Sequence, residues 1–369
     1  MKKAKLFDKV EVDFILLATI LLLVAIGVIA VYSASSYIAL NGPQHNDKFF
    51  LYKQGAAAVL GIIIMLAVEK IDYHKLKRIT GLVVIAAVIL LIIVLFTPPV
   101  NGARRWIQMP FGTLQPSEIA KYTVVLVLAK SIEKRGEKIK YFWSSVFVYL
   151  LIGGAFAGLV ILEKNLSIAS VIMGVTLIML FVGGAKLAHT VGLVGGIIPV
   201  GLLFIILEPY RLQRALNFTN PWKDAKGAGY QLCQSLLALG SGGILGVGLG
   251  RSRQKCFYIP EPYNDFIFSI IAEEKGLIGC IVIMILFLII IHRGIKIAVH
   301  AKDAYGTLLA VGITSVIAIQ AIINIAVVTG SMPVTGVPLP FISYGGSSLT
   351  INLVAMGILL NISSQSNTK

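Results

Sequence analysis

The residues best able to do chemistry lie in four short segments that combine charged side chains with proline, glycine or tryptophan. The first segment, 102–107, places Arg104 and Arg105 beside Trp106. Two guanidinium groups next to an indole suit an interfacial belt, because tryptophan anchors at the membrane surface. They equally suit a phosphate clamp, because arginine binds phosphate oxygens through two parallel hydrogen bonds. Both interpretations stay open.

The second segment, 115–121, carries Glu118 and Lys121 three positions apart, so that they can pair on one face of a predicted helix. Ser117 is the expected N-cap of that helix, and Pro116 is the expected helix entry. The pair is either a plain structural salt bridge or the wall of a polar cavity, since charges at membrane depth are costly and often functional.

The third segment, 260–268, has two prolines that stiffen the entry to an apolar run, and Asn264 or Asp265 is expected to cap the helix there. Asp265 is either a simple cap or a general base. A helix N-terminus favours the carboxylate form, which is the form that a base needs. Glu273 and Glu274, two turns further on, are expected to face the interior of the bundle.

The fourth segment, 338–348, has prolines followed by glycines and contains Ser343. This composition predicts an irregular backbone, which membrane depth tolerates only against protein or a cavity. The glycine-rich stretch 246–250 follows no predicted strand, so it gives no nucleotide-binding signal.

The elements that must position these residues are long apolar blocks. The chain has 369 residues, of which 57% are hydrophobic and only 13% charged, with a mean hydropathy of +0.88. That is too little charge for a soluble surface, and the blocks indicate spanning helices. We predict an all-α integral membrane protein, a single polytopic domain over 1–369 with about ten transmembrane helices. The expected spans are 12–35, 50–68, 79–97, 117–132, 142–162, 166–183, 189–207, 265–291, 307–330 and 346–362.

The lysines and arginines predict the orientation of these helices. The net charge of +15 does not indicate nucleic acid, because no aromatic-basic platform accompanies it. The basic residues instead gather in alternate short connections, which the positive-inside rule places in the cytoplasm together with both termini. They are Lys2, Lys3, Lys5, Lys9, Lys70, Lys75, Lys77, Arg78, Lys130, Lys134, Arg135, Lys138, Lys140, Arg293, Lys296 and Lys302.

The opposite, outer side then holds the connections 41–49, 98–116, 163–165, 208–264 and 331–345. The connection between the seventh and eighth spans, 209–264, is too long to be a simple link. Within it, 230–239 has helical periodicity and is expected to lie in the membrane interface as an amphipathic helix.

Together these segments resemble the SEDS family, the shape, elongation, division and sporulation proteins FtsW, RodA and SpoVE, over nearly the whole chain. The stretches 220–222, 252–255 leading into 261–268, 327–330 and 333–336 are similar to the FtsW/SpoVE branch. The resemblance implies a peptidoglycan glycosyltransferase that polymerises lipid II on the outer face of the cytoplasmic membrane. It also implies a class B penicillin-binding protein as partner, beside other divisome or sporulation proteins.

The resemblance also assigns residues. The essential aspartate of the family falls on Asp265, its Arg-Trp pair on Arg105 and Trp106, and its Glu and Lys on Glu118 and Lys121. Arg105 and Lys121 are expected to hold the leaving pyrophosphate, with a divalent cation, Mg or Mn, as a candidate cofactor. We also expect four polar residues of the same segments to bind substrate: Gln115, Ser117, Glu261 and Ser343.

One departure from the family pattern limits this assignment. The family often has a Gln-Pro-Asp-Leu-Gly-Thr stretch between the fifth and sixth spans, and this chain has Asn165 at the acidic position with Glu163 nearby. No role of that aspartate is therefore carried over to this chain.

Two rival functions remain. A lipid II flippase would share the polytopic body and the intramembrane Glu118–Lys121 pair, but it would need essential polar groups at the midplane and on both faces. A scaffold that only recruits the crosslinking partner would tolerate changes at Asp265 and Glu118. The concentration of polar residues on the outer side favours chemistry there.

Overall fold

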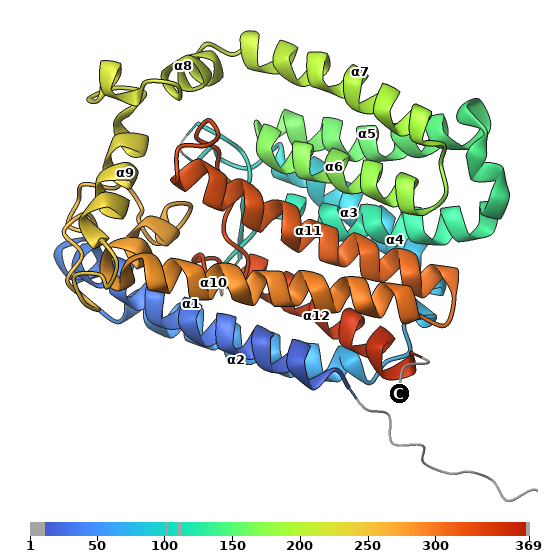
Figure 1. The fold of residues 1–369 in the computed structure, drawn as a ribbon, viewed down its shortest axis with the longest axis horizontal. Coiled ribbons are helices and arrows are strands. Elements are labelled where there is room, and N and C mark those ends of the chain that lie inside the picture. The colour runs from blue at the N-terminus through green and yellow to red at the C-terminus, as the bar shows by residue number, and fades with distance from the viewer. Residues whose placement is uncertain (1–11, 101, 110–111, 367–369) are drawn as a thin grey trace, which may run out of the picture.

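The computed structural model describes residues 12–100, 102–109 and 112–366, and it is mainly helical (Figure 1). The four N-terminal lysines of the orientation argument lie outside these residues. The α-helices are α1 (Phe14–Asn41), α2 (Phe49–Glu69), α3 (Lys75–Val94), α4 (Pro116–Arg135), α5 (Phe147–Leu162), α6 (Leu166–Val182), α7 (Leu187–Ile206), α8 (Pro209–Asn217), α9 (Tyr230–Gly242), α10 (Ile267–His300), α11 (Ala304–Val328) and α12 (Gly346–Gln365). Short 3-10 and π-helical turns are η1 (Gly136–Lys140), η2 (Phe142–Val146) and η3 (Pro221–Asp224), and β1 (Ile107–Met109) pairs antiparallel with β2 (Gly112–Leu114).

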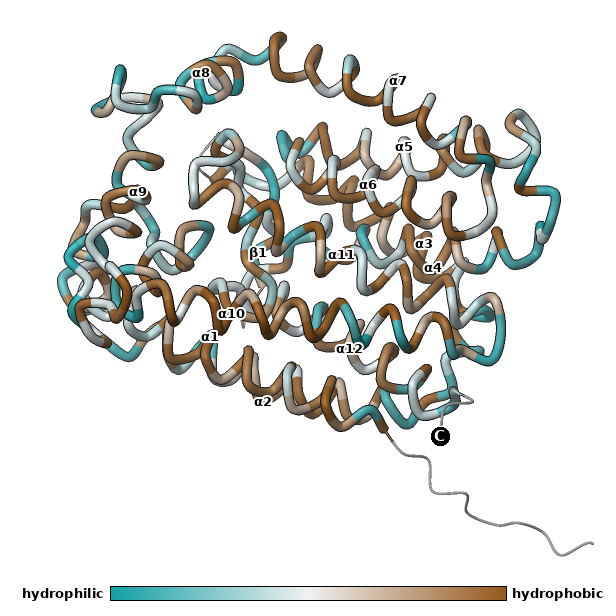
Figure 2. The backbone as a smooth tube through the Cα atoms, in the orientation of Figure 1, coloured by the Kyte–Doolittle hydropathy of each residue, from teal (hydrophilic) through white to brown (hydrophobic). Residues whose placement is uncertain are grey.

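Eight of the described helices are long and apolar enough to cross a membrane, which confirms a multi-pass membrane protein. They are α1, α2, α3, η2 continued by α5, α7, α10, α11 and α12. The other two predicted spans form α4 and α6. Their passage through the membrane stays a prediction, because α4 is rich in polar residues and α6 has only 17 residues. Figure 2 shows hydrophobic residues along the helices and hydrophilic ones gathered at the connections.

The bundle is organised around α11, which packs against α4, α6, α10 and α12. Beyond it, α1 lies between α2 and α10, and α2 packs along α12. The exception is α7, which packs mainly against α6 and α8 and has no buried residue. Figure 1 shows α7 and α8 set apart from the other helices.

The connections of the bundle separate into two sets, one at each end. At one end, which we call the basic end (70–75, 133–146 and 292–303), His74 lies 2.8 Å from Asp303 and Lys77 lies 2.7 Å from Glu133. At the other end, the site end (98–116, 163–165, 208–266 and 331–345), Ser343 donates to the carbonyl of Asn264 at 2.9 Å. The connections named here therefore sort between the two ends as predicted, and which end faces the cytoplasm stays a prediction.

The long connection 209–264 is folded rather than loose. It contains α8, which the sequence did not suggest, and the predicted helix at 230–239, which extends to Gly242 as α9. The α9 helix packs on α10, and Ser235 Oγ donates to the carbonyl of Val328 at 2.7 Å and lies 2.8 Å from Ser269 Oγ. One face of α9 is therefore covered by protein.

The α10 helix is broken at Gly276, where φ is +64°, a backbone conformation that favours glycine. A break leaves main-chain groups without helical partners, and at this depth they must be satisfied by protein. Segment 243–248 supplies the partners. The amides of Val247, Gly248, Leu277 and Ile278 donate to the carbonyls of Glu273, Glu274, Gly243 and Ile244, at 2.9, 3.0, 2.9 and 3.3 Å respectively.

Candidate functional site

Asp265 lies half-buried at the site end, just before α10. The helix begins at Ile267 with Phe266 as its N-cap residue and no side-chain cap, so the prediction that Asn264 or Asp265 caps it was wrong. The side chain of Asn264 instead donates to Glu261 Oε2 at 2.8 Å. The rigid turn ends before the helix starts, and Asp265 is therefore not committed to holding the helix.

The carboxylate of Asp265 faces residues from two other connections. A Cβ atom on Gly336 would lie 3.3 Å from Asp265 Oδ2 and 3.8 Å from Arg105 Nη1. Arg105 is fixed in turn, because its Nη2 donates to the carbonyl of Lys164 at 2.5 Å. Four connections of the site end thus meet around one carboxylate and one guanidinium group.

Burial raises the pKa of Asp265 to about 6, and the negative charge of Glu261 adds to the rise, while Arg105 and Arg214 lower it. This direction is opposite to the one expected from a helix N-terminus, because desolvation outweighs the helix dipole. At neutral pH the carboxylate form still prevails. A pKa near the working pH suits a group that takes up a proton and releases it again.

Arg214 is a site residue that the sequence analysis missed. It lies in the last turn of α8, close enough to Asp265 to lower its pKa, and it donates to Gln231 Oε1 at 3.0 Å. The missed signal was the helical periodicity of 209–217, which has polar residues on one face. Asp265 thus has two basic neighbours: Arg105 from the predicted phosphate clamp, and Arg214 from the long connection.

Asn324 is a second missed residue, and it holds the site together from α11. Its Nδ2 donates to the carbonyls of Asp265 and Val337, at 2.8 Å each. Ser343, predicted to bind substrate, is buried: its hydroxyl donates to Asn264 and accepts from the Leu339 amide at 2.8 Å. In this structure Ser343 links the irregular 338–345 segment to the turn before α10.

The predicted ion pair of Glu118 and Lys121 is present, with 3.0 Å between Oε2 and Nζ and neither side chain exposed. Lys121 also donates to Gln320 Oε1 at 2.8 Å, and Ser348 donates to Glu118 Oε2 at 2.6 Å. The pair therefore joins α4, α11 and α12 inside the protein, and Lys121 does not reach open space.

The start of α4 differs in detail from the prediction. Pro116 is the helix entry as expected, but Gln115 occupies the N-cap position, so the prediction of Ser117 as the cap was wrong. Ser117 is buried within the first turn and accepts from Gln115 Nε2 at 3.1 Å. Trp106, the other predicted substrate residue here, is half-buried just before β1.

Glu163 lies two residues before Asn165, in the stretch that departs from the pattern of the family that the sequence resembles. Its side chain is fully buried, and neither carboxylate oxygen has a hydrogen-bond partner among the described residues. Burial raises its pKa to about 8, although Ser117 and Arg105 lower it. Asn165 has a local role: it caps α6 by accepting from the Ile168 amide.

The donor set for a protein-held divalent cation is missing from the part of the chain that the structure describes. Within it, no group of three or more His, Cys, Asp or Glu side chains could hold a metal ion. A Mg or Mn ion that one or two carboxylates share with substrate phosphates stays a prediction, because magnesium is commonly held in that way rather than by a protein cage.

Comparison with known proteins identifies the family. The model of the FtsW, RodA and SpoVE family, described as cell cycle protein, matches residues 13–368. This chain therefore belongs to that family of multi-pass membrane proteins.

Individual relatives cover nearly all of the chain. Stage V sporulation protein E of Bacillus subtilis is 44% identical over 364 residues, covering 96% of this chain and 98% of that protein. The probable peptidoglycan glycosyltransferase FtsW of a Geobacter species is 40% identical over 358 residues, covering 96% and 97%. Among solved structures, a chain of a peptidoglycan synthase complex has a TM-score of 0.78 at 26% identity, covering 97% and 99%. The rod-shape-determining protein RodA of Thermus thermophilus has a TM-score of 0.71 at 26% identity, covering 97% and 98%.

Proposed function

We propose that this protein is a peptidoglycan glycosyltransferase that joins lipid II units into glycan strands on the outer face of the cytoplasmic membrane. The observation that carries the proposal is the carboxylate of Asp265, which does not cap a helix. It lies half-buried beside Arg105 and Arg214 at the site end. The names of the FtsW relatives support the same activity. Both termini are then cytoplasmic, and septal or spore wall synthesis is the setting.

Lipid II is a disaccharide-peptide on a polyprenyl pyrophosphate, and the reaction needs a base and a group that holds the leaving pyrophosphate. Asp265 takes the proton from the 4-hydroxyl of the acceptor sugar, whose oxygen attacks the anomeric carbon of the donor. The bond to the pyrophosphate breaks, that group leaves with the bonding electrons, and the α-linked donor becomes a β-1,4 bond. Arg105 and Arg214 stabilise the charge that develops on the pyrophosphate.

Glu118 and Lys121 act on this site indirectly. Because Lys121 is buried and already donates to Glu118 and Gln320, we assign the phosphate role to the two arginines. The ion pair instead fixes α4, the helix that follows the arginine-bearing connection. Trp106, Gln115 and Glu261 remain proposed contacts of the substrate at the edge of the site.

The test is the variant Asp265→Asn, which keeps the shape of the side chain and removes the base. With lipid II in detergent and a class B penicillin-binding protein present, polymerisation should fall by about 100-fold or more. Asp224→Asn, an exposed aspartate in the same long connection, serves as the control. Polymerisation by Asp265→Asn at the normal rate would disprove the assignment.

A lipid II flippase is the second candidate, and the buried Glu118–Lys121 pair is the observation that favours it. Detergent separates the two functions, since transport has no meaning without a membrane but glycan strands still form. A protein that translocates lipid II in vesicles and forms no strands in detergent, with or without the partner, would be the flippase.

A further inference from the structure

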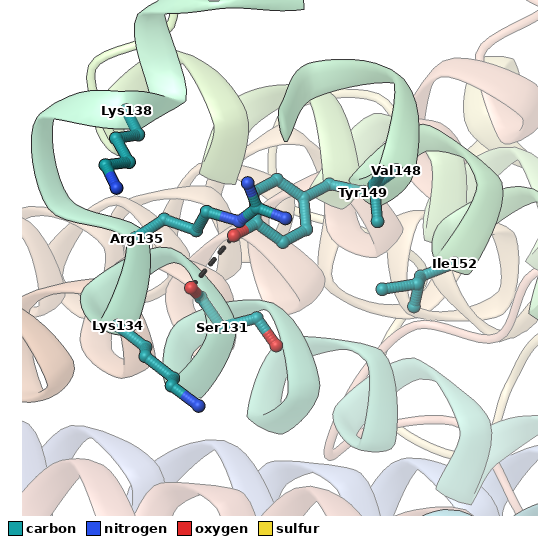
Figure 3. Close-up of a pocket in the computed structure, with 7 residues that line it drawn as sticks. All are labelled: Ser131, Lys134, Arg135, Lys138, Val148, Tyr149 and Ile152. Carbon is teal, nitrogen blue, oxygen red and sulfur yellow. Dashed lines mark hydrogen bonds between the residues drawn. The ribbon is translucent and has the colours of Figure 1, made fainter. Parts of the chain in front are cut away.

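A pocket of about 510 Å³ opens at the basic end of the bundle, far along α4 from its Pro116 entry (Figure 3). It lies between the last turn of α4, the η1 turn and the first turns of α5. Nothing in the proposed reaction uses this pocket. Its lining residues are Ser131, Lys134, Arg135, Lys138, Val148, Tyr149 and Ile152.

The pocket concentrates positive charge, and among the described residues none of its three basic side chains forms an ion pair. Three of its seven lining residues are basic and none is acidic. The neighbouring carboxylates are engaged elsewhere within the described chain: Glu133 pairs with Lys77 at 2.7 Å, and Glu137 pairs with Lys140 at 3.7 Å. Three like charges around one cavity repel each other, and an anion placed among them relieves that repulsion.

The back of the pocket is built rather than open. Tyr149 is buried, and its hydroxyl donates to the carbonyl of Ser131 at 2.8 Å, which ties α5 to α4 (Figure 3). The guanidinium group of Arg135 lies against the same hydroxyl. The cavity therefore has a fixed polar floor with one arginine already oriented by it.

The remaining wall is apolar and belongs to the helix 142–162, which is long and apolar enough to cross a membrane. Val148 and Ile152 are four residues apart on α5, so they form one strip on the same helix face. Trp143 and Tyr141, just before them, are 76% and 68% exposed, which is typical of aromatic side chains at the membrane–water interface. A ligand in this pocket thus meets cations at its polar end and hydrocarbon along its length.

We propose that this pocket binds an anionic phospholipid of the adjacent leaflet. Its phosphate lies among Lys134, Arg135 and Lys138, and one acyl chain runs along Val148 and Ile152. Basic pockets between helices at this level of a membrane recognise anionic headgroups in general. The apolar strip selects a lipid over a soluble phosphate, which would leave that strip uncovered. The proposed function enters only in naming the leaflet as the cytoplasmic one.

The test compares full-length protein with two triple variants that lose the same charge. The pocket variant is Lys134→Gln, Arg135→Gln and Lys138→Gln. The control variant is Lys75→Gln, Arg78→Gln and Lys296→Gln, at the same end but outside the pocket. Each is titrated with phosphatidylglycerol, phosphatidylcholine of the same acyl chains, and glycerol 3-phosphate, and bound molecules are counted by native mass spectrometry.

Phosphatidylglycerol should bind the parent and the control variant equally well. It should bind the pocket variant about tenfold or more weakly. Phosphatidylcholine and glycerol 3-phosphate should bind weakly to all three. Equal loss in both variants would mean diffuse surface charge, no loss in the pocket variant would mean another site, and equal binding of glycerol 3-phosphate would mean a soluble-anion site. Each of these results overturns the proposal. If the triple pocket variant does not fold, Lys134→Gln with Lys138→Gln replaces it, because neither amino group holds an ion pair within the described residues.

Discussion

Gly336 lies directly against the carboxylate of Asp265. A Cβ atom at this position would be 3.3 Å from Oδ2, closer than side chains ordinarily approach, and 3.8 Å from Arg105 Nη1. The connection 331–345 therefore leaves one face of the carboxylate open only because it has no side chain there. Gly336 therefore lies next to both Asp265 and Arg105, the two residues that have roles in the proposed reaction.

Gly336→Ala should consequently impair the reaction without unfolding the protein. The methyl group forces the carboxylate of Asp265 to shift by a few tenths of an ångström. We expect polymerisation to fall about tenfold, and further with Gly336→Val. Gly240→Ala in α9, where a Cβ meets nothing within 4 Å, is the matched control. Lipid II polymerisation and the apparent melting temperature in detergent are measured together. Full activity of Gly336→Val would remove Gly336 from the site.

The pH dependence of polymerisation should report the pKa of Asp265. The base works as a carboxylate, so kcat/KM should rise about tenfold per pH unit below the pKa of about 6 and level off above it. Because the charge of Glu261 raises that pKa, Glu261→Gln should move the acid limb toward lower pH. Glu137→Gln at the opposite end is the control. If the acid limb does not move in Glu261→Gln, the charge of Glu261 does not influence the pKa of the base.

Asn324 should prove to be a positioning residue. Asn324→Asp keeps the shape but replaces the amide that donates to Asp265 and Val337 with a group that repels both carbonyls, at a cost of about 1–3 kcal/mol or more in stability. Asn361→Asp is the control, since its Nδ2 donates to the Glu69 carbonyl at the basic end. Both variants should melt earlier, but only Asn324→Asp should lower kcat and displace the acid limb. Equal kinetics in the two would reduce Asn324 to a structural role.

Glu163 should make the protein less stable as pH rises. Its pKa is about 8 in the folded protein, against an ordinary value of 4.5. Between these two values the unfolded chain loses the proton while the folded protein keeps it, so stability falls across pH 4.5 to 8. Glu163→Gln removes this effect and should raise the melting temperature at pH 8 by several degrees, a gain of about 2–4 kcal/mol, with no change near pH 4.5. Exposed Glu208→Gln is the control. A variant that melts earlier than the parent at pH 8 would contradict the burial argument.

Much of the fold could be predicted from the sequence because membrane spans are set by local composition. Long apolar blocks must satisfy their own main-chain groups, so all ten predicted segments form helices. The Glu118–Lys121 pair was predictable for the same local reason, since three positions on a helix bring two side chains together.

The details of the site could not be predicted because they depend on contacts between distant segments. Arg214 approaches Asp265 from α8, and Asn324 reaches its main chain from α11, across a separation that no periodicity encodes. The cap at Asp265 was predicted wrongly because sequence patterns place a helix start only to within a residue or two. The helix begins at Ile267, so the carboxylate of Asp265 does not cap it. The raised pKa followed from burial, which a sequence does not state.

The break in α10 divides that helix mechanically. Four main-chain hydrogen bonds bind segment 243–248 to both sides of Gly276, and Asp265 precedes the first of the two halves. The α9 helix leads directly into that segment, so it is joined to both halves of α10 through main-chain hydrogen bonds. A partner that docks on α9 would therefore act on the half of α10 that begins two residues after Asp265, the proposed general base.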